Sequence, residues 1–160
     1  MPIDVKGKKM KQLVFVLLLA SSVVIASAQI STGGSVDVNF GSDMKPQGTG
    51  SWNLEYQFLS IASAGIKLAG QTDFEHKFAV TPTVFARLYP FSGAFAEANL
   101  GGKFSWQEKV FSKNFTMGGS VGWRISSGRT YIEPKINFDY AFGAKDPFSW
   151  SGGVGAGYSF

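Results

Sequence analysis

The stretch Tyr131-Ile-Glu-Pro-Lys-Ile-Asn-Phe-Asp-Tyr-Ala-Phe142 alternates between two kinds of position along its whole length. Every second residue from Ile132 onward is apolar, whereas the other set carries Glu133, Lys135 and Asp139. A strand turns successive side chains to opposite faces, so the pattern predicts a strand with one apolar and one charged face. Soluble strands usually have about 5–6 residues, and a tilted membrane-spanning strand needs roughly 9–11. This segment is long enough to cross a bilayer.

Seven further segments of the chain show the same alternation, so eight strands are expected. They span residues 30–41, 49–59, 63–70, 77–89, 94–106, 114–125, 131–142 and 149–160. Short turns at 60–62, 90–93 and 126–129 alternate with longer polar loops at 42–48, 71–76, 107–113 and 143–148. An even strand number with such connections is typical of bacterial outer-membrane barrels. The predicted fold class is an all-β, closed antiparallel up-and-down transmembrane β-barrel of eight strands.

The first 28 residues have the pattern of a cleaved secretory signal peptide. Four lysines precede a mainly apolar run at 13–25, and Ala26-Ser-Ala28 then supplies a signal-peptidase site at Ala26 and Ala28. The run is too short for a spanning helix, which needs about 20 residues. We therefore expect a signal peptide at 1–28 and a barrel domain at 29–160. Removing four Lys and one Asp lowers the formal charge from +4 to +1, so no nucleic-acid partner is indicated.

The two faces of the strands differ in what they carry, and this decides which face is expected inside. The polar set holds five acids and five bases: Asp37, Glu55, Lys67, Arg87, Glu97, Lys103, Arg124, Glu133, Lys135 and Asp139. Inside a closed barrel such charges must pair, because an uncompensated buried charge is costly. Inner glycines would leave room there for large side chains: Gly118, Gly122, Gly153, Gly155 and Gly157 beside Phe85, Phe95 and Tyr131. A water-soluble barrel or sandwich would instead turn the charges outward.

Aromatic side chains and prolines add two further expectations. Two girdles are expected around a lipid-facing band. Trp52, Trp106 and Trp150 would lie near the strand ends that meet the longer loops, and Phe58, Leu88 and Phe160 near the turn end. Pro82 and Pro134 fall within predicted strands, where proline cannot donate to the hydrogen-bond ladder. A bulge or a missing bond is expected at each proline.

The end of the chain resembles the C-terminal signal by which the barrel-assembly machinery recognises its clients. The residues of this match are Trp150, Val154, Ala156, Tyr158 and the terminal Phe160. Over residues 29–160 the chain resembles the small eight-stranded outer-membrane β-barrels of the OmpA/OmpX type. The runs Arg87-Leu-Tyr-Pro-Phe91 and Tyr131-Ile-Glu-Pro134 also resemble segments of such barrels. The resemblance implies an outer-membrane location in a diderm bacterium, with membrane lipid and the assembly machinery as partners.

No group of residues in the sequence indicates catalysis. Barrel enzymes of this type resemble one another in a His that works with Ser and a carboxylate, and this chain has one histidine, His76, between Glu75 and Lys77. That loop reads as solvated, and neither a phosphate loop nor a metal-ligand spacing is present. We therefore expect no enzyme, no cofactor and no metal site. The expected role is envelope integrity or surface contact, with a small-solute channel or a soluble, periplasmic lipocalin-like binder as alternatives.

Overall fold

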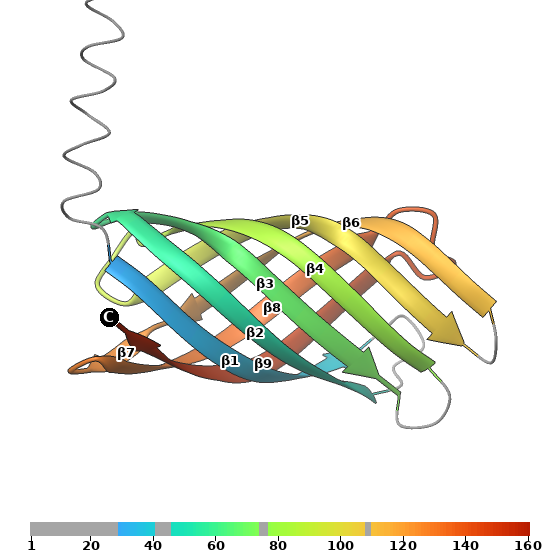
Figure 1. Cartoon of the computed structure of the whole chain (residues 1–160), viewed down its shortest axis with the longest axis horizontal. Coiled ribbons are helices and arrows are strands. Elements are labelled where there is room, and N and C mark those ends of the chain that lie inside the picture. Colours follow the sequence, from blue (N-terminus) through green and yellow to red (C-terminus); the bar gives the residue numbers. More distant parts are fainter. Residues whose placement is uncertain (1–28, 41–45, 74–76, 108–109) are drawn as a thin grey trace, which may run out of the picture.

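The computed structural model of the chain is a barrel of antiparallel strands (Figure 1), and it describes residues 29–40, 46–73, 77–107 and 110–160. Its strand segments are β1 (Gln29–Phe40), β2 (Pro46–Leu59), β3 (Ala62–Thr72), β4 (Lys77–Leu88), β5 (Ala94–Gln107), β6 (Val110–Trp123), β7 (Ile125–Ser127), β8 (Thr130–Ala141) and β9 (Phe148–Ser159). Consecutive strands pair except β6 and β7, which both pair with β8, and β1 also pairs with β9, which closes the sheet. The predicted closed antiparallel barrel is confirmed.

The nine segments form eight transmembrane strands, because β7 continues β6 after an interruption at Arg124. Both segments pair with β8 in one register, as Val121↔Ile136 and Ile125↔Ile132 show. The ladder lacks the two pairs between Gly122↔Lys135 and Ile125↔Ile132, and Pro134 is one of the unpaired residues of β8. The predicted number of eight strands is therefore confirmed.

The two strand prolines interrupt pairing without shifting the register. β4 and β5 pair at Val80↔Phe104 and again at Thr83↔Gly101, and the positions between them, including Pro82, have no partner on β5. A proline has no N–H to donate, so the ladder loses a bond while the strand direction is kept. Missing pairs, and not bulges, are thus the outcome at both prolines. The register shift of the barrel lies instead at Gln57–Leu59 in β2, which the sequence analysis did not predict.

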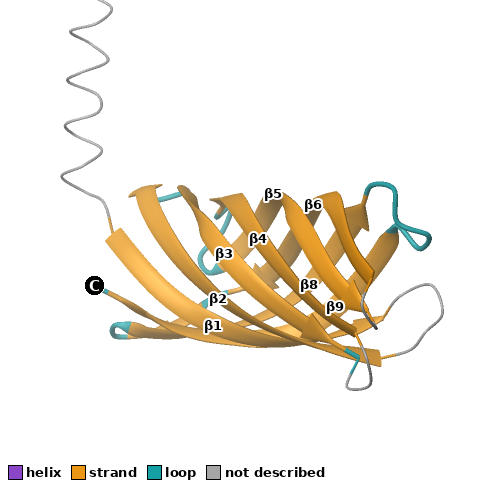
Figure 2. Ribbon diagram, turned by 45° about the vertical axis from the view of Figure 1, so that its right-hand side comes forward, coloured by secondary structure: helices purple, strands orange, loops and turns teal. Residues whose placement is uncertain are grey.

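Turns and loops separate to opposite ends of the barrel, and Figure 2 shows both ends. At the turn end, β2–β3, β4–β5 and β7–β8 are joined by short connections, and the last residue, Phe160, lies there with the start of β1. At the loop end the strands reach further than predicted. β2 begins at Pro46 and β6 at Val110, so residues expected in loops at 42–48 and 107–113 belong partly to strands. At this end β6 pairs with β5 as far as Gln107↔Val110.

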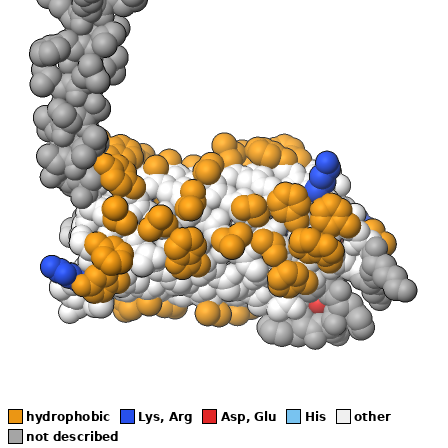
Figure 3. Space-filling view, in the orientation of Figure 1, with side chains coloured by type: hydrophobic (Ala, Val, Ile, Leu, Met, Phe, Trp, Pro, Cys, Tyr) orange, Lys and Arg blue, Asp and Glu red, His pale blue; other side chains and the backbone are white. Residues whose placement is uncertain are grey.

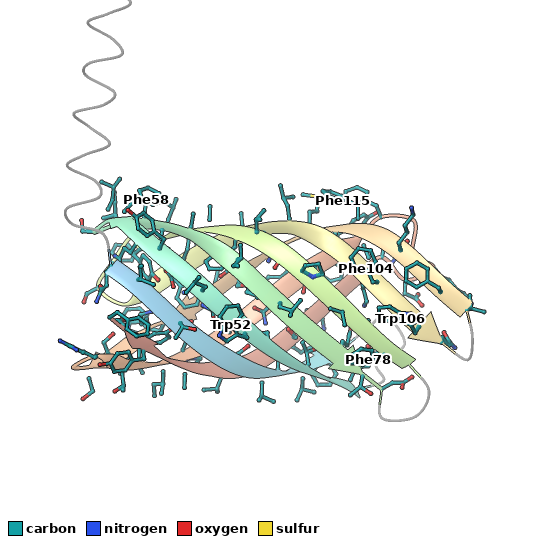
Figure 4. All side chains as sticks on the ribbon, in the orientation of Figure 1. Trp52, Phe58, Phe78, Phe104, Trp106 and Phe115 are labelled. Atoms are coloured by element: carbon teal, nitrogen blue, oxygen red, sulfur yellow. The ribbon has the colours of Figure 1, made fainter. Side chains whose placement is uncertain are left out.

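The outer wall of the barrel is apolar, and large hydrophobic side chains are exposed on it all along the strands (Figure 3). Figure 4 shows Phe104, Trp106 and Phe115 pointing outward near the loop end. Trp52 was predicted at that end, and this prediction is wrong: because β2 starts at Pro46, Trp52 lies near the middle of its strand. Among the described residues, no helix is long and apolar enough to cross a membrane.

Candidate functional site

All ten charged residues predicted for the lumen lie at inward-facing positions of the barrel. They divide into two groups along the barrel axis. The group at the turn end, here called the closure cluster, contains Glu55, Arg87, Glu97, Arg124 and Glu133. The group toward the loop end lines a cavity and contains Asp37, Lys67, Lys103, Lys135 and Asp139. Ion pairs within 4 Å link eight of the ten residues.

Arg87 is the centre of the closure cluster, and its side chain is only 2 % exposed. Its Nη2 donates to Glu97 Oε2 at 2.7 Å, and its Nη1 donates to Glu133 Oε1 at 2.9 Å and to Glu55 Oε2 at 3.2 Å. Glu97 is the register partner of Arg87 on β5, whereas Glu55 and Glu133 reach it from β2 and β8 across the lumen. One guanidinium therefore connects four strands around the barrel.

Arg124 and Tyr89 complete the hydrogen bonding of the two glutamates that reach across. Arg124 donates from Nε to Glu133 and from Nη2 to Glu55, each at 2.5 Å. The Tyr89 hydroxyl donates to Glu55 Oε1 at 2.7 Å, and Ser63 Oγ donates to the same oxygen. Glu55 is fully buried, and each of its carboxylate oxygens accepts at least two hydrogen bonds. Such multiple charge-assisted bonds are what a buried carboxylate requires.

Aromatic rings close the spaces between these charges. The Arg87 guanidinium lies 4.2 Å from the ring centroid of Phe95, and that of Arg124 lies 4.2 Å from the ring of Tyr131. Each ring has a glycine directly across from it on the neighbouring strand, Gly122 opposite Phe95 and Gly157 opposite Tyr131. A Cβ at Gly122 would come within 2.7 Å of the Phe95 ring. Glycine at these positions thus makes room for large side chains in a narrow lumen.

Tyr89 lies one residue past the end of β4, at the turn end of the cluster. Burial raises the pKa of its hydroxyl well above the usual range, and the neighbouring Glu55 carboxylate acts in the same direction. Arg87 and Arg124 oppose that shift. The phenol therefore stays protonated and remains a hydrogen-bond donor to Glu55.

The loop-end half of the lumen is open space by comparison. A cavity of about 740 Å³ lies there, lined mainly by hydroxyl and amide side chains together with the second group of charges. Lys135 Nζ donates to Ser35 at 2.9 Å and lies 3.7 Å from Asp37. Lys103 donates to Gln71 at 2.7 Å. Asp139, in contrast, has no ion pair among the described residues, so charge pairing is incomplete in this half.

Sequence analysis did not identify two polar contributors to the lumen. Tyr89 was placed at a strand end and given no role, although it holds Glu55. Asn137 belongs to the same alternating set as Glu133 and Lys135 and was given no role. Its Nδ2 donates to both Asp37 at 3.0 Å and Ser151 at 2.8 Å, and its Oδ1 accepts from Ser120 at 2.7 Å. The alternation of the strand predicts that the Asn137 side chain faces inward. It does not indicate which partners the amide meets.

The weak candidate site at His76 and the signal-cleavage residues Ala26 and Ala28 lie outside the described residues. Asp73, in the same predicted loop as His76, is described and belongs to the lining of the loop-end cavity. Within the described part of the chain, no three His, Cys, Asp or Glu side chains come together as metal ligands do.

Several solved outer-membrane barrels share this architecture at low sequence identity. The chain is similar to neisserial surface protein A, with a TM-score of 0.57, 7% identity, and coverage of 83% of this chain and 97% of that one. It is similar to the N-terminal β-barrel domain of Pseudomonas aeruginosa OprF, with a TM-score of 0.57, 11% identity, and coverage of 82% and 97%. It is also similar to Ail, the attachment invasion locus protein of Yersinia pestis, with a TM-score of 0.55, 13% identity, and coverage of 83% and 97%.

No protein-family model matches the chain, and no curated protein matches it in sequence. At identities this low, the solved structures establish the fold alone. The fold is that of an eight-stranded outer-membrane barrel, as the sequence predicted, and the apolar outer wall is the surface that such a barrel presents to lipid.

Proposed function

We propose that the chain is an integral barrel of the outer membrane of a diderm bacterium, with no enzymatic activity and no steadily open pore. Its role in this proposal is to support envelope integrity or to make contact at the cell surface. The polarity of the wall carries the membrane assignment: charges such as Glu55 and Arg87 are buried inside, whereas side chains such as Val36 and Leu88 are exposed outside. Soluble monomers rarely expose apolar patches larger than a few hundred Å². A lipocalin-like binder would need the opposite polarity.

The closure cluster supports the absence of a steady pore. Eight strands enclose an interior just wide enough for side chains. At the turn end that interior is filled by two arginines, three glutamates and the rings stacked on them. A hydrated solute would have to separate several buried ion pairs to pass. Breaking even one such pair by removing a partner costs about 3–5 kcal/mol in proteins.

A small-solute channel is the second candidate, and the loop-end cavity favours it. The polar lining of this cavity includes Lys67, and Lys67 Nζ forms an ion pair with Glu97 of the closure cluster. A channel would need only the turn-end half to rearrange. Conductance of the purified protein in planar bilayers separates the two candidates. Steady current through the wild-type protein would favour the channel, and its absence would favour the closed barrel.

The membrane assignment itself is tested by electrophoretic mobility of the outer-membrane fraction with and without boiling in detergent. A closed barrel resists the detergent until it is boiled, so two different mobilities are expected. A single mobility, with the protein in the soluble periplasmic fraction, would contradict the proposal. For the envelope role, a strain lacking the protein should become more sensitive to detergents and bile salts, and the wild-type chain should restore resistance.

We also propose that two terminal segments serve export and assembly. Residues 1–28 would direct secretion and be removed after Ala28, so the mature protein should begin at Gln29 by N-terminal mass analysis. The last strand would be read by the barrel-assembly machinery. Its outward side chains include Trp150, Tyr158 and Phe160, and this strand closes the barrel against β1.

A further inference from the structure

The outer wall carries a single charged strand residue. Of the described strand positions that face outward, only Lys113 on β6 is charged; the side chain of Lys77 is not described, and its register position is inward. The register pairs Lys113 with the outward Phe104 of β5. Arg129 and Lys145, the other exposed cations of the described chain, lie in a turn and in a loop. An ammonium on an otherwise apolar wall needs an explanation.

Aromatic rings surround Lys113 on the wall. Phe111 and Phe115 share its face of β6, and Phe104 lies across from it on β5. The Phe104 and Phe111 ring centroids are 6.4 Å apart, and those of Trp106 and Phe111 are 5.4 Å apart. Figure 4 shows Phe104, Trp106 and Phe115 on this part of the wall. The side chain of Lys113 is therefore surrounded by the aromatic side chains of Phe104, Phe111 and Phe115, here called the aromatic collar.

The depth of Lys113 follows from the same register. The Trp106↔Phe111 pair lies nearer to the loop end than the Phe104↔Lys113 pair does. Lys113 is thus one step inside the outermost aromatic pair, at the level where such belts meet lipid headgroups. A lysine at this depth extends its four-carbon stem so that the ammonium reaches the headgroup region. The stem packs along the rings while Nζ remains at the interface.

The side chain of Lys113 has no polar partner among the residues that the structure describes. It makes no hydrogen bond or ion pair with any of them, although the backbone of Lys113 belongs to the β5–β6 ladder. β8 ends at Ala141, opposite Thr116. Beyond this pair, Phe142 N still donates to Phe115 O at 2.9 Å, and the ring centroids of Phe115 and Phe142 are 5.6 Å apart. The side chain of Lys113, two residues nearer to the loop end, is exposed, so a headgroup can approach it from the lipid side. Below it, the exposed side chains of Met117 and Leu100 offer an apolar surface for acyl chains.

We propose that Lys113 and its aromatic collar bind a phosphate-bearing anionic lipid in the leaflet that faces the loop end. The ammonium pairs with the lipid phosphate, Phe104, Phe111 and Phe115 surround the upper acyl region, and the chains lie along the wall below. Charge complementarity favours this occupant, because one cation without a partner on an apolar wall matches an amphiphile with one anionic end. A zwitterionic lipid offers the same chains but no net charge. This inference rests on the proposed membrane location.

The test follows quenching of the fluorescence of Trp106, which contacts Phe111 of the aromatic collar. A variant that keeps only this tryptophan, with Trp52, Trp123 and Trp150 replaced by Phe, is folded into detergent–lipid micelles. Brominated phosphatidylglycerol and brominated phosphatidylcholine are titrated separately. Phosphatidylglycerol should quench Trp106 at an about fivefold lower mole fraction, because one lysine near a lipid surface contributes about 1 kcal/mol. Lys113→Gln should abolish the preference, and Lys113→Arg should retain it.

Arg129→Gln is the matched control, because it removes an exposed cation at the opposite end of the barrel. It should leave the preference at Trp106 unchanged. Equal quenching by the two lipids in the parent variant, or a preference that survives Lys113→Gln, would overturn the lipid site. Displacement of phosphatidylglycerol by inorganic phosphate, beyond that by chloride of equal ionic strength, would support the pairing of the ammonium with the phosphate group. Failure of both lipids to quench Trp106 would instead contradict the membrane location.

Discussion

Replacing Arg87 by methionine tests whether the closure cluster holds the barrel together. The change removes four hydrogen bonds from the guanidinium to the carboxylates of Glu55, Glu97 and Glu133. With Lys67 included, the cluster changes from three cations and three carboxylates to two cations and three carboxylates. One buried carboxylate is then left uncompensated. Removing one partner of a buried pair costs about 3–5 kcal/mol, so the free energy of unfolding should fall by about that amount.

A second substitution separates charge balance from the loss of packing. In Arg87→Met with Glu133→Gln, Arg124 still pairs with Glu55 and Lys67 still pairs with Glu97. Every remaining carboxylate then has its own cation. The double variant should therefore regain roughly 2 kcal/mol relative to Arg87→Met, within the range of coupling energies between contacting residues.

Urea titrations of the barrel in lipid vesicles, followed by tryptophan fluorescence and by the heat-dependent gel shift, measure these free energies. The deficit of Arg87→Met should shrink as the pH falls, because protonation removes the surplus carboxylate charge. The charge-balance argument would be refuted if Arg87→Met lost less than about 1 kcal/mol. It would also be refuted if the double variant were as unstable as the sum of the two single variants.

Three further substitutions probe the lumen and the chain end. Gly157→Ala should cost about 1–3 kcal/mol in urea titrations because a Cβ there collides with an inward ring, whereas Gly152→Ala, which meets nothing within 4 Å, should be close to neutral. Phe160→Ala should reduce the amount of protein in the outer membrane while leaving the refolded barrel stable in vitro; Phe91→Ala, with 72% exposure against 70%, is the control that should assemble normally. Tyr89→Phe should lose about 1 kcal/mol at neutral pH. The raised pKa of Tyr89 contributes stability that is present below about pH 10, where the unfolded phenol ionises, and is lost above it, so the variant's alkaline decline should be shallower.

The face that each strand turns inward could be read from the sequence because it depends on a local property. Side chains alternate with period two whatever the neighbouring strand is, so Glu55 and Trp52 had to face opposite sides. The strand ends were less predictable. β2 begins at Pro46 and β6 at Val110, within segments that were predicted as loops. Only the pairing with the neighbouring strand shows where the ladder ends.

The partners within the lumen could not be read from the sequence, because they depend on how strands across the barrel are staggered. Arg87 and Glu97 are register neighbours, and a hairpin with a short turn nearly fixes that pair. Glu55 and Glu133 belong to strands that do not pair with β4, and they meet Arg87 only through the tilt and shear of the closed sheet. The equal count of acids and bases was not a guide to pairing, since Asp139 has no ion pair among the described residues.

Side-chain length explains why the lumen is closed at one end and hollow at the other. The closure cluster uses glutamate and arginine, whose chains are long enough to reach across the barrel, and the fork of Arg87 can bind carboxylates from three directions. The inward rings of Phe95 and Tyr131 lie in the same half, where facing glycines admit them. The loop-end half has the shorter aspartates, with lysines that bind at single points, and its small hydroxyl and amide side chains stay near the wall. Because several residues from different strands fill the turn end together, shortening any one of them should weaken the barrel before it opens a path.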